Sequence, residues 1–169
     1  MQAILAVVGV GAALTLFAAA ALWWNEPSRR ITRALTRILD EKPDVVATAG
    51  ARGQGAALAV DTQRIAVLPG FKEAGLVFGF DEWMGLELIF DGRVAARAFR
   101  NEPRKGLEHI SPEVSSVMLR LSFDDVRDPE FEMVLWTQDD RPAPGGHDAA
   151  SALQAARRWL ARAEVVLRR

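Results

Sequence analysis

Residues 84–99 read MGLELIFDGRVAARAF, and this stretch decides the fold. Its first half carries an apolar side chain at every second position, which is the period of a strand with one buried face. These residues are Met84, Leu86, Leu88 and Phe90. The following pair, Asp91-Gly92, is favoured in two-residue type I′ turns. The stretch is therefore predicted to form a β-hairpin.

The tight turn and the apolar pattern of this hairpin favour different registers. A two-residue turn continued without a break would pair Leu86 with Arg97 and place the arginine on the core face. Burying an unpaired charge costs several kcal/mol, so a register shifted by one residue is favoured. The shifted pairs are Phe90 with Val94, Leu88 with Ala96 and, on the outer face, Glu87 with Arg97. We therefore predict a longer turn or a bulge near Gly92.

Five further strands around this hairpin complete an antiparallel sheet structure, which one helix follows. The period changes from 3.6 to 2 after Gly55, and several segments alternate apolar and polar residues. The seven predicted strands are Ala56–Asp61, Arg64–Leu68, Gly75–Phe80, Met84–Phe90, Val94–Phe99, Ser116–Phe123 and Phe131–Thr137. An amphipathic helix capped by Asp148 is predicted to run to about Leu167. The expected fold class is α+β.

The segments FGFDEWMGLELIFDG at residues 78–92 and MLRLSFDD at residues 118–125 resemble bacterial pleckstrin-homology-like (PH-like) domains, as does FEMVL at 131–135. The resemblance covers about residues 56–167. It implies a seven-stranded barrel whose open corner is covered by the C-terminal helix, in a binding or assembly module rather than an enzyme. Phosphoinositide-binding members of the wider fold carry a Lys/Arg cluster between their first two strands, whereas Arg64 is the single arginine there.

The N-terminal segment Ala3–Trp24 contains no charged residue and no proline. Its 22 residues would span about 33 Å as a helix, which matches a hydrocarbon core roughly 30 Å thick. Trp23 and Trp24 stand where an interfacial aromatic belt is expected. No basic residue precedes the segment, which favours an uncleaved single-pass transmembrane helix over a signal peptide. Cleavage remains the alternative.

Four arginines follow the transmembrane segment and set its predicted orientation. By the positive-inside rule they place the soluble domain on the cytoplasmic side of the inner (cytoplasmic) membrane. They lie on the polar side of a second predicted helix, Ser28–Glu41, whose other side is apolar. This basic amphipathic helix could lie on anionic lipid or pack on the domain. The arginines are Arg29, Arg30, Arg33 and Arg37.

Three regions are therefore expected along the chain. Residues 1–25 form the transmembrane helix, residues 26–55 the juxtamembrane helix with a glycine-rich linker, and residues 56–169 the PH-like domain. The linker contains Pro43 and the stretch Ala49–Gly55.

Composition and motifs indicate a protein without enzymatic activity. The chain has no cysteine and a net charge of −1, which gives no global attraction to nucleic acid. His109 and His147 have no second ligand at metal spacing, so neither a metal nor a cofactor is expected. The glycines at 50, 53 and 55 match no phosphate-binding motif. No small-molecule substrate is indicated.

The expected function is a membrane-tethered interaction or scaffolding module, a subunit of a larger bacterial envelope assembly. Its partners would be the membrane and a second protein or another copy of the chain. The alternative is a peripheral domain that senses anionic lipid through the four arginines. Trp23, Trp24 and the arginines would lie at the membrane interface. The candidate partner contacts are Trp83, Trp136, Arg100, Arg104 and Lys105, where burial of the two tryptophans is the competing interpretation.

Overall fold

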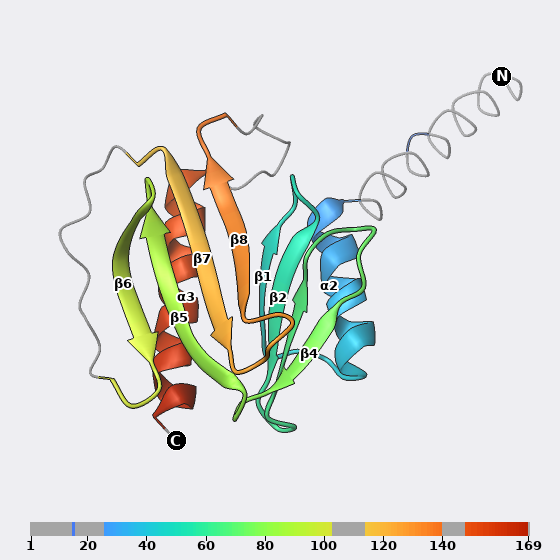
Figure 1. The fold of residues 1–169 in the computed structure, drawn as a ribbon. Coiled ribbons are helices and arrows are strands. Elements are labelled where there is room, and N and C mark those ends of the chain that lie inside the picture. The colour runs from blue at the N-terminus through green and yellow to red at the C-terminus, as the bar shows by residue number, and fades with distance from the viewer. Residues whose placement is uncertain (1–14, 16–25, 103–113, 140–147, 169) are drawn as a thin grey trace, which may run out of the picture.

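The computed structural model describes residue 15 and residues 26–102, 114–139 and 148–168. These residues form an α+β structure with two antiparallel four-stranded sheets and two long helices (Figure 1). None of the helices in these ranges is long and apolar enough to cross a bilayer. The predicted transmembrane segment, including Trp23 and Trp24, lies outside the described residues apart from Thr15.

The first sheet, sheet A, is an antiparallel meander in the order β1-β2-β3-β4. Its strands are β1 (Val45–Ala49), β2 (Gln54–Ala59), β3 (Arg64–Leu68) and β4 (Leu76–Gly79). The second, sheet B, has the order β6-β5-β7-β8, so β5 lies between β6 and β7 and pairs with both. Its strands are β5 (Trp83–Phe90), β6 (Arg93–Phe99), β7 (Ser116–Phe123) and β8 (Glu130–Thr137).

One apolar core joins the inner faces of both sheets to the C-terminal helix α3 (Ala149–Leu167). Helix α3 lies behind sheet B in Figure 1 and packs on β5, β6 and β7. The carboxylate of Asp148 caps its start by accepting a hydrogen bond from the Ser151 amide at 2.8 Å. The other side of sheet B is polar, where Arg120 pairs with Glu87 and Glu132 across the strands. The predicted single buried face of this sheet is therefore confirmed.

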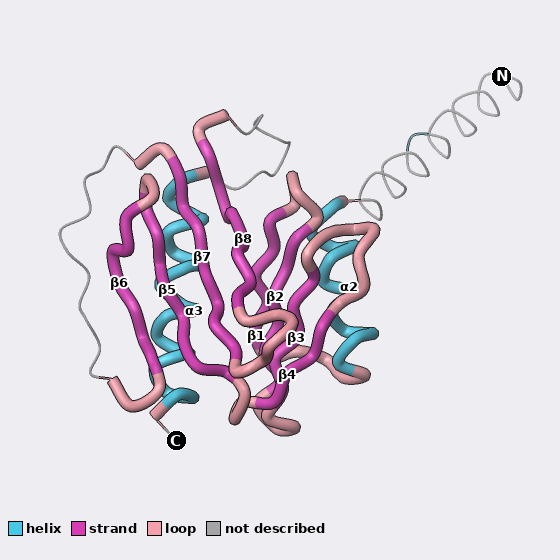
Figure 2. Tube along the Cα trace, in the orientation of Figure 1, coloured by secondary structure: helices cyan, strands magenta, loops and turns pink. Residues whose placement is uncertain are grey.

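Helix α2 (Pro27–Leu39) packs on the outer face of sheet A rather than standing apart from the domain (Figure 2). Its apolar side is fully buried through Ile31, Leu35 and Leu39. The sheet offers small side chains beneath it, namely Gly55, Ala57, Ala59, Ala66 and Gly75. A Cβ added to Gly55 would lie 2.3 Å from Ile31 Cγ2, so glycine allows this close approach. Of the two placements open from the sequence, the structure shows the helix on the domain.

The expectation of seven strands was wrong, because the described residues contain eight. The missed strand is β1, which pairs with β2 from Val45–Leu58 to Ala49–Gln54. The predicted linker Ala49–Gly55 is accordingly the end of β1, a turn and the start of β2. Its glycines and alanines were interpreted as linker composition. Ala49 is instead part of the main core, and Gly55 lies against Ile31 and Leu35 of α2.

The β5–β6 hairpin satisfies the tight turn and the apolar pattern together. Asp91 and Gly92 have φ values of 48° and 75°, as a type I′ turn requires, and Phe90 pairs with Arg93. A shift in register between Leu88 and Ile89 then leaves Ala95 as the extra residue of a bulge. Beyond the bulge the pairs Leu88–Ala96 and Glu87–Arg97 form as predicted. The predicted pair of Phe90 with Val94 was wrong, because the bulge lies beyond the turn rather than within it.

A second bulge changes which residue of β5 enters the core. The β5–β7 register shifts between Trp83 and Gly85, and Trp83 is fully buried. Met84 was expected on the buried face but is half-exposed and lies outside the core cluster. The bulge interrupts the alternation and turns the larger indole inward.

The turn residue Asp91 also clamps the chain that leads into β7. Its carboxylate accepts hydrogen bonds from the Ser115 and Ser116 amides at 2.9 and 2.8 Å, and from the Ser115 hydroxyl at 2.9 Å. Slight desolvation raises the pKa of Asp91, but the bonds from Ser115 and Ser116 together lower it below its ordinary value of 3.8. The ionised carboxylate therefore holds the β5–β6 turn to the start of β7.

We expect the stabilisation by Asp91 to disappear in acid. Its folded-state pKa is lowered, so the contribution is present above the ordinary pKa of 3.8 and is lost as the pH falls through the folded value. The variant Asp91→Asn should therefore be less stable than the parent near neutral pH, and the difference should shrink at lower pH. Urea unfolding of both proteins across the acidic range measures this. A difference that is independent of pH would contradict the assignment.

Candidate functional site

A groove of about 900 Å³ lies between the C-terminal half of α3 and one end of sheet A. Its volume falls in the range of ligand pockets, roughly 300–1,000 Å³. The apolar lining consists of Val45, Leu58, Val60, Phe80, Ala161, Val165 and Val166. The charged lining consists of three acids and three arginines, namely Asp44, Asp61, Asp81, Arg100, Arg158 and Arg162.

Helix α3 forms one wall because its residues divide between core and groove. Trp159, Leu160 and Ala163 pack into the core. Arg158 and Arg162, four residues apart and so on one face of the helix, are exposed toward the groove. Val165 continues this wall and is 57% exposed. A helix face that contacts only solvent is expected to be polar, so the exposed valine beside two arginines is unusual.

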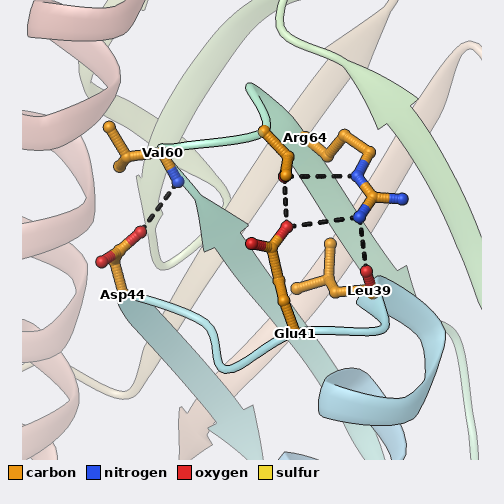
Figure 3. Close-up of polar contacts among 6 residues, drawn as sticks. Leu39, Glu41, Asp44, Val60 and Arg64 are labelled. Carbon is orange, nitrogen blue, oxygen red and sulfur yellow. Dashed lines mark hydrogen bonds and ion pairs between the residues drawn. The ribbon is translucent and has the colours of Figure 1, made fainter.

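The opposite wall is the β2–β3 turn, which a polar network fixes to the end of α2 (Figure 3). The Arg64 guanidinium donates to the Leu39 carbonyl at 2.5 Å and to the Glu41 carboxylate at 3.2 Å. Glu41 also accepts the Thr62 hydroxyl. A cation at the last carbonyls of a helix is favoured by the helix dipole. The lone arginine of this turn is thus engaged in a structural contact.

Asp44 ties the start of β1 to the same turn. Its carboxylate accepts a hydrogen bond from the Val60 amide at 2.8 Å, and its own amide donates to the Leu58 carbonyl at 2.9 Å (Figure 3). Val60 is held in a 41% exposed position at the groove as a result. The wall is therefore built before any ligand binds.

Arg100 closes the third side of the groove, beyond the end of β6. Its guanidinium donates to the Phe80 carbonyl and, at 3.3 Å, to the Trp83 carbonyl. Its Nε is buried and has no hydrogen-bond partner among the described residues. These contacts hold the β4–β5 turn against the end of β6. Arg100 therefore both lines the groove and holds its wall in position.

The groove offers apolar contact and charged side chains of both signs. Arginines and carboxylates of equal number surround the valines, which suits a ligand with apolar side chains and charges of both signs. Within the described ranges no three His, Asp or Glu side chains come together as metal ligands. His109 and His147 lie outside these ranges. The arrangement can bind and orient a ligand.

Comparison with protein-family models, curated proteins and solved structures gave no match to this chain. The groove geometry therefore carries the functional argument alone.

The structure places the predicted partner contacts in different environments. Arg100 lines the groove, whereas Trp83 is fully buried and donates its indole N–H to the Gly85 carbonyl at 2.8 Å. Trp136 is half-buried and packs on the main core. Arg104 and Lys105 lie outside the described residues. For Trp83 the structure therefore agrees with burial, the competing interpretation from the sequence.

The four arginines of α2 stay together on its outward side. Arg29, Arg30 and Arg37 are exposed, and Arg33 is half-buried. Arg29 pairs with Glu26 at 2.9 Å. Sequence reasoning missed the groove valines and the role of Arg158 and Arg162. The available signal was Val165, an apolar residue on the otherwise polar side of the last helix.

Proposed function

We propose that this chain is a membrane-tethered, non-enzymatic interaction module that binds a segment of a partner protein in the α3 groove. The tether is the N-terminal segment Ala3–Trp24, and the domain faces the cytoplasm from the inner membrane. The observation that carries the proposal is the preformed groove with its exposed valines and balanced charges. The partner is a subunit of an envelope assembly or another copy of the chain.

A polypeptide segment suits this groove better than a small polar substrate. Val60 and Val165 are 41% and 57% exposed, which is apolar surface that a partner would cover. The surrounding Asp61, Asp81 and Arg158 form a charged rim of both signs. Protein interfaces combine an apolar centre with a polar rim in this way. Charges of both signs also select the register of the bound segment.

A PH-like architecture is part of the same proposal. Two antiparallel sheets followed by a C-terminal helix support it. The extra strand β1, the pairing of β7 with β5 and the helix packed outside sheet A would be departures from the seven-stranded pattern. Domains of this kind serve mostly as binding modules, which is the function proposed for the groove.

Site-specific crosslinking in intact membranes tests the partner site. A photoreactive amino acid at Val165 should capture a discrete partner band. The same probe at Val126, which is fully exposed in the β7–β8 turn and does not line the groove, should not. Arg158→Glu together with Arg162→Glu should reduce the Val165 adduct by reversing the charge of one wall. Equal adducts at Val165 and Val126, or none at Val165, would contradict the proposal.

The alternative function, sensing of anionic lipid, is favoured by the outward arginines of α2. The apolar side of α2 is buried on sheet A, so the helix cannot insert that side between lipids. Only its charges remain for headgroups, each worth about 1 kcal/mol near an anionic surface. Salt should therefore weaken such binding strongly. In this function α2 would act as a charged surface rather than an inserted helix.

A further inference from the structure

Three segments that are separate in sequence meet at the start of α2. They are residues 26–30, the β1–β2 turn at 50–53 and the first part of the β3–β4 loop at 69–73, and Figure 2 shows them at one end of the molecule. A Cβ added to Gly50 would lie 3.4 Å from Pro27 Cβ. A Cβ added to Gly53 would lie 2.4 Å from the Phe71 ring. We call this surface the α2 end.

Phe71 is the exposed apolar residue of the α2 end. Its ring lies on the backbone of Gly53, whose φ of +70° and lack of a Cβ allow the contact. The guanidinium of Arg30 stacks over the ring at 4.7 Å from its centroid. The side chain is nevertheless 45% exposed. An aromatic ring is thus held in place at the surface beside a cation.

The charge of the α2 end is positive. Its three segments carry four cationic side chains against two acidic ones. The cations are Arg29, Arg30, Arg52 and Lys72, and the acids are Glu26 and Glu73. Glu26 is paired with Arg29 at 2.9 Å. A fixed aromatic ring among cations is the composition of surfaces that bind at the headgroup level of anionic membranes.

We infer that the α2 end docks on the anionic bilayer surface, with Phe71 among the headgroups and Arg30 and Lys72 on their phosphates. The inference rests on the proposed membrane tether, because α2 begins three residues after Trp24. The short connection keeps the start of α2 at the interface. Docking through a folded three-segment surface differs from binding by α2 alone, because it requires residues of two loops.

The absence of cysteine from the chain allows a single environment-sensitive label at each chosen site. We would place a nitrobenzoxadiazole label on Ala74→Cys, an exposed position in the β3–β4 loop, in the full chain reconstituted into vesicles. The control label is on Val126→Cys, a fully exposed position in the β7–β8 turn and outside the three segments of the α2 end. Vesicles of phosphatidylcholine alone are compared with vesicles that also contain phosphatidylglycerol.

The label at residue 74 should shift to the blue in anionic vesicles and not in neutral ones. The shift should be lost at 1 M salt, where the screening length is about 3 Å. Arg30→Glu with Lys72→Glu should abolish it, whereas Arg127→Glu with Arg157→Glu, the same charge change at exposed positions elsewhere, should not. The label at residue 126 should report water throughout.

Two outcomes separate this inference from the proposed function. Release of the chain from vesicles by alkaline carbonate would overturn the tether, and the docking inference with it. Retention in carbonate with no blue shift at residue 74, or with a shift at residue 126 instead, would overturn the docking alone. A shift at residue 74 that is equal in neutral vesicles would also overturn it, because anionic lipid would then have no role.

Discussion

Leu35→Ala is expected to lower the free energy of unfolding by about 2–5 kcal/mol, the usual cost of truncating a buried leucine. Leu35 is fully buried between α2 and sheet A. The sheet residues beneath α2 are mostly glycine and alanine, among them Gly55, Ala57 and Ala66, which have no side-chain atoms that can move to fill the space that the leucine leaves. The loss should therefore include the cost of a cavity as well as that of the lost apolar contact.

Urea unfolding of the detergent-solubilised full chain measures this loss. The matched control is Arg37→Ala on the exposed side of the same helix, which should change stability by no more than about 0.5 kcal/mol. If both variants unfolded like the parent, α2 would not be part of the cooperative structure. The result thus also measures whether the helix belongs to the domain in solution.

Trp83→Ala should have the largest effect of any single truncation considered, about 3–5 kcal/mol. Trp83 is fully buried where the β4–β5 turn meets both sheets, with the Phe80 ring 6.3 Å away between centroids. Its indole N–H donates to the Gly85 carbonyl at 2.8 Å. Removing the indole therefore empties a large volume and also leaves a carbonyl without this donor.

Trp136→Ala is the matched control, because Trp136 is the half-buried tryptophan of sheet B. Its loss of stability in the same urea titration should be clearly smaller. Both tryptophans were predicted partner contacts. The two variants therefore distinguish a role in the stability of the core from a role in binding the partner. If Trp83→Ala left stability unchanged but removed the crosslink from Val165, the indole would contact the partner and its assignment to the core would be wrong.

Much of the fold followed from periodicity where one face of a strand is buried and the other is wet. Strand β7 was predicted to the residue, since its buried apolar residues alternate with the half-buried Met118, Arg120 and Ser122. The prediction missed strand β1 of sheet A, although β3, which is also buried on both faces, was predicted to the residue. Strand β2 packs on the main core by one face and under α2 by the other, so it shows no alternation, and its partner β1 was read as a linker. Small residues in close packing have the composition of a flexible segment.

The groove could not be predicted in the same way, because its walls come from segments that only the folded chain brings together. Asp44, Val60, Arg100 and Arg158 belong to four separate parts of the sequence. Arg100 alone of these was singled out, on the basis of its loop. No local period describes such a site. The one indication of the groove in the local sequence was Val165. Its exposure is unexpected only when it is known which side of α3 faces the core.

The position of α2 also determines how the domain would resist a mechanical load. The helix runs along sheet A from the α2 end toward the end that carries the groove (Figure 1). A partner that pulls on the groove of a tethered chain would therefore load α2 in shear along its whole buried side, rather than peel it away turn by turn. Arg64 holds the far end of the helix through the Leu39 carbonyl. Contacts loaded in parallel yield together, so α2 would resist such a load along its whole buried side.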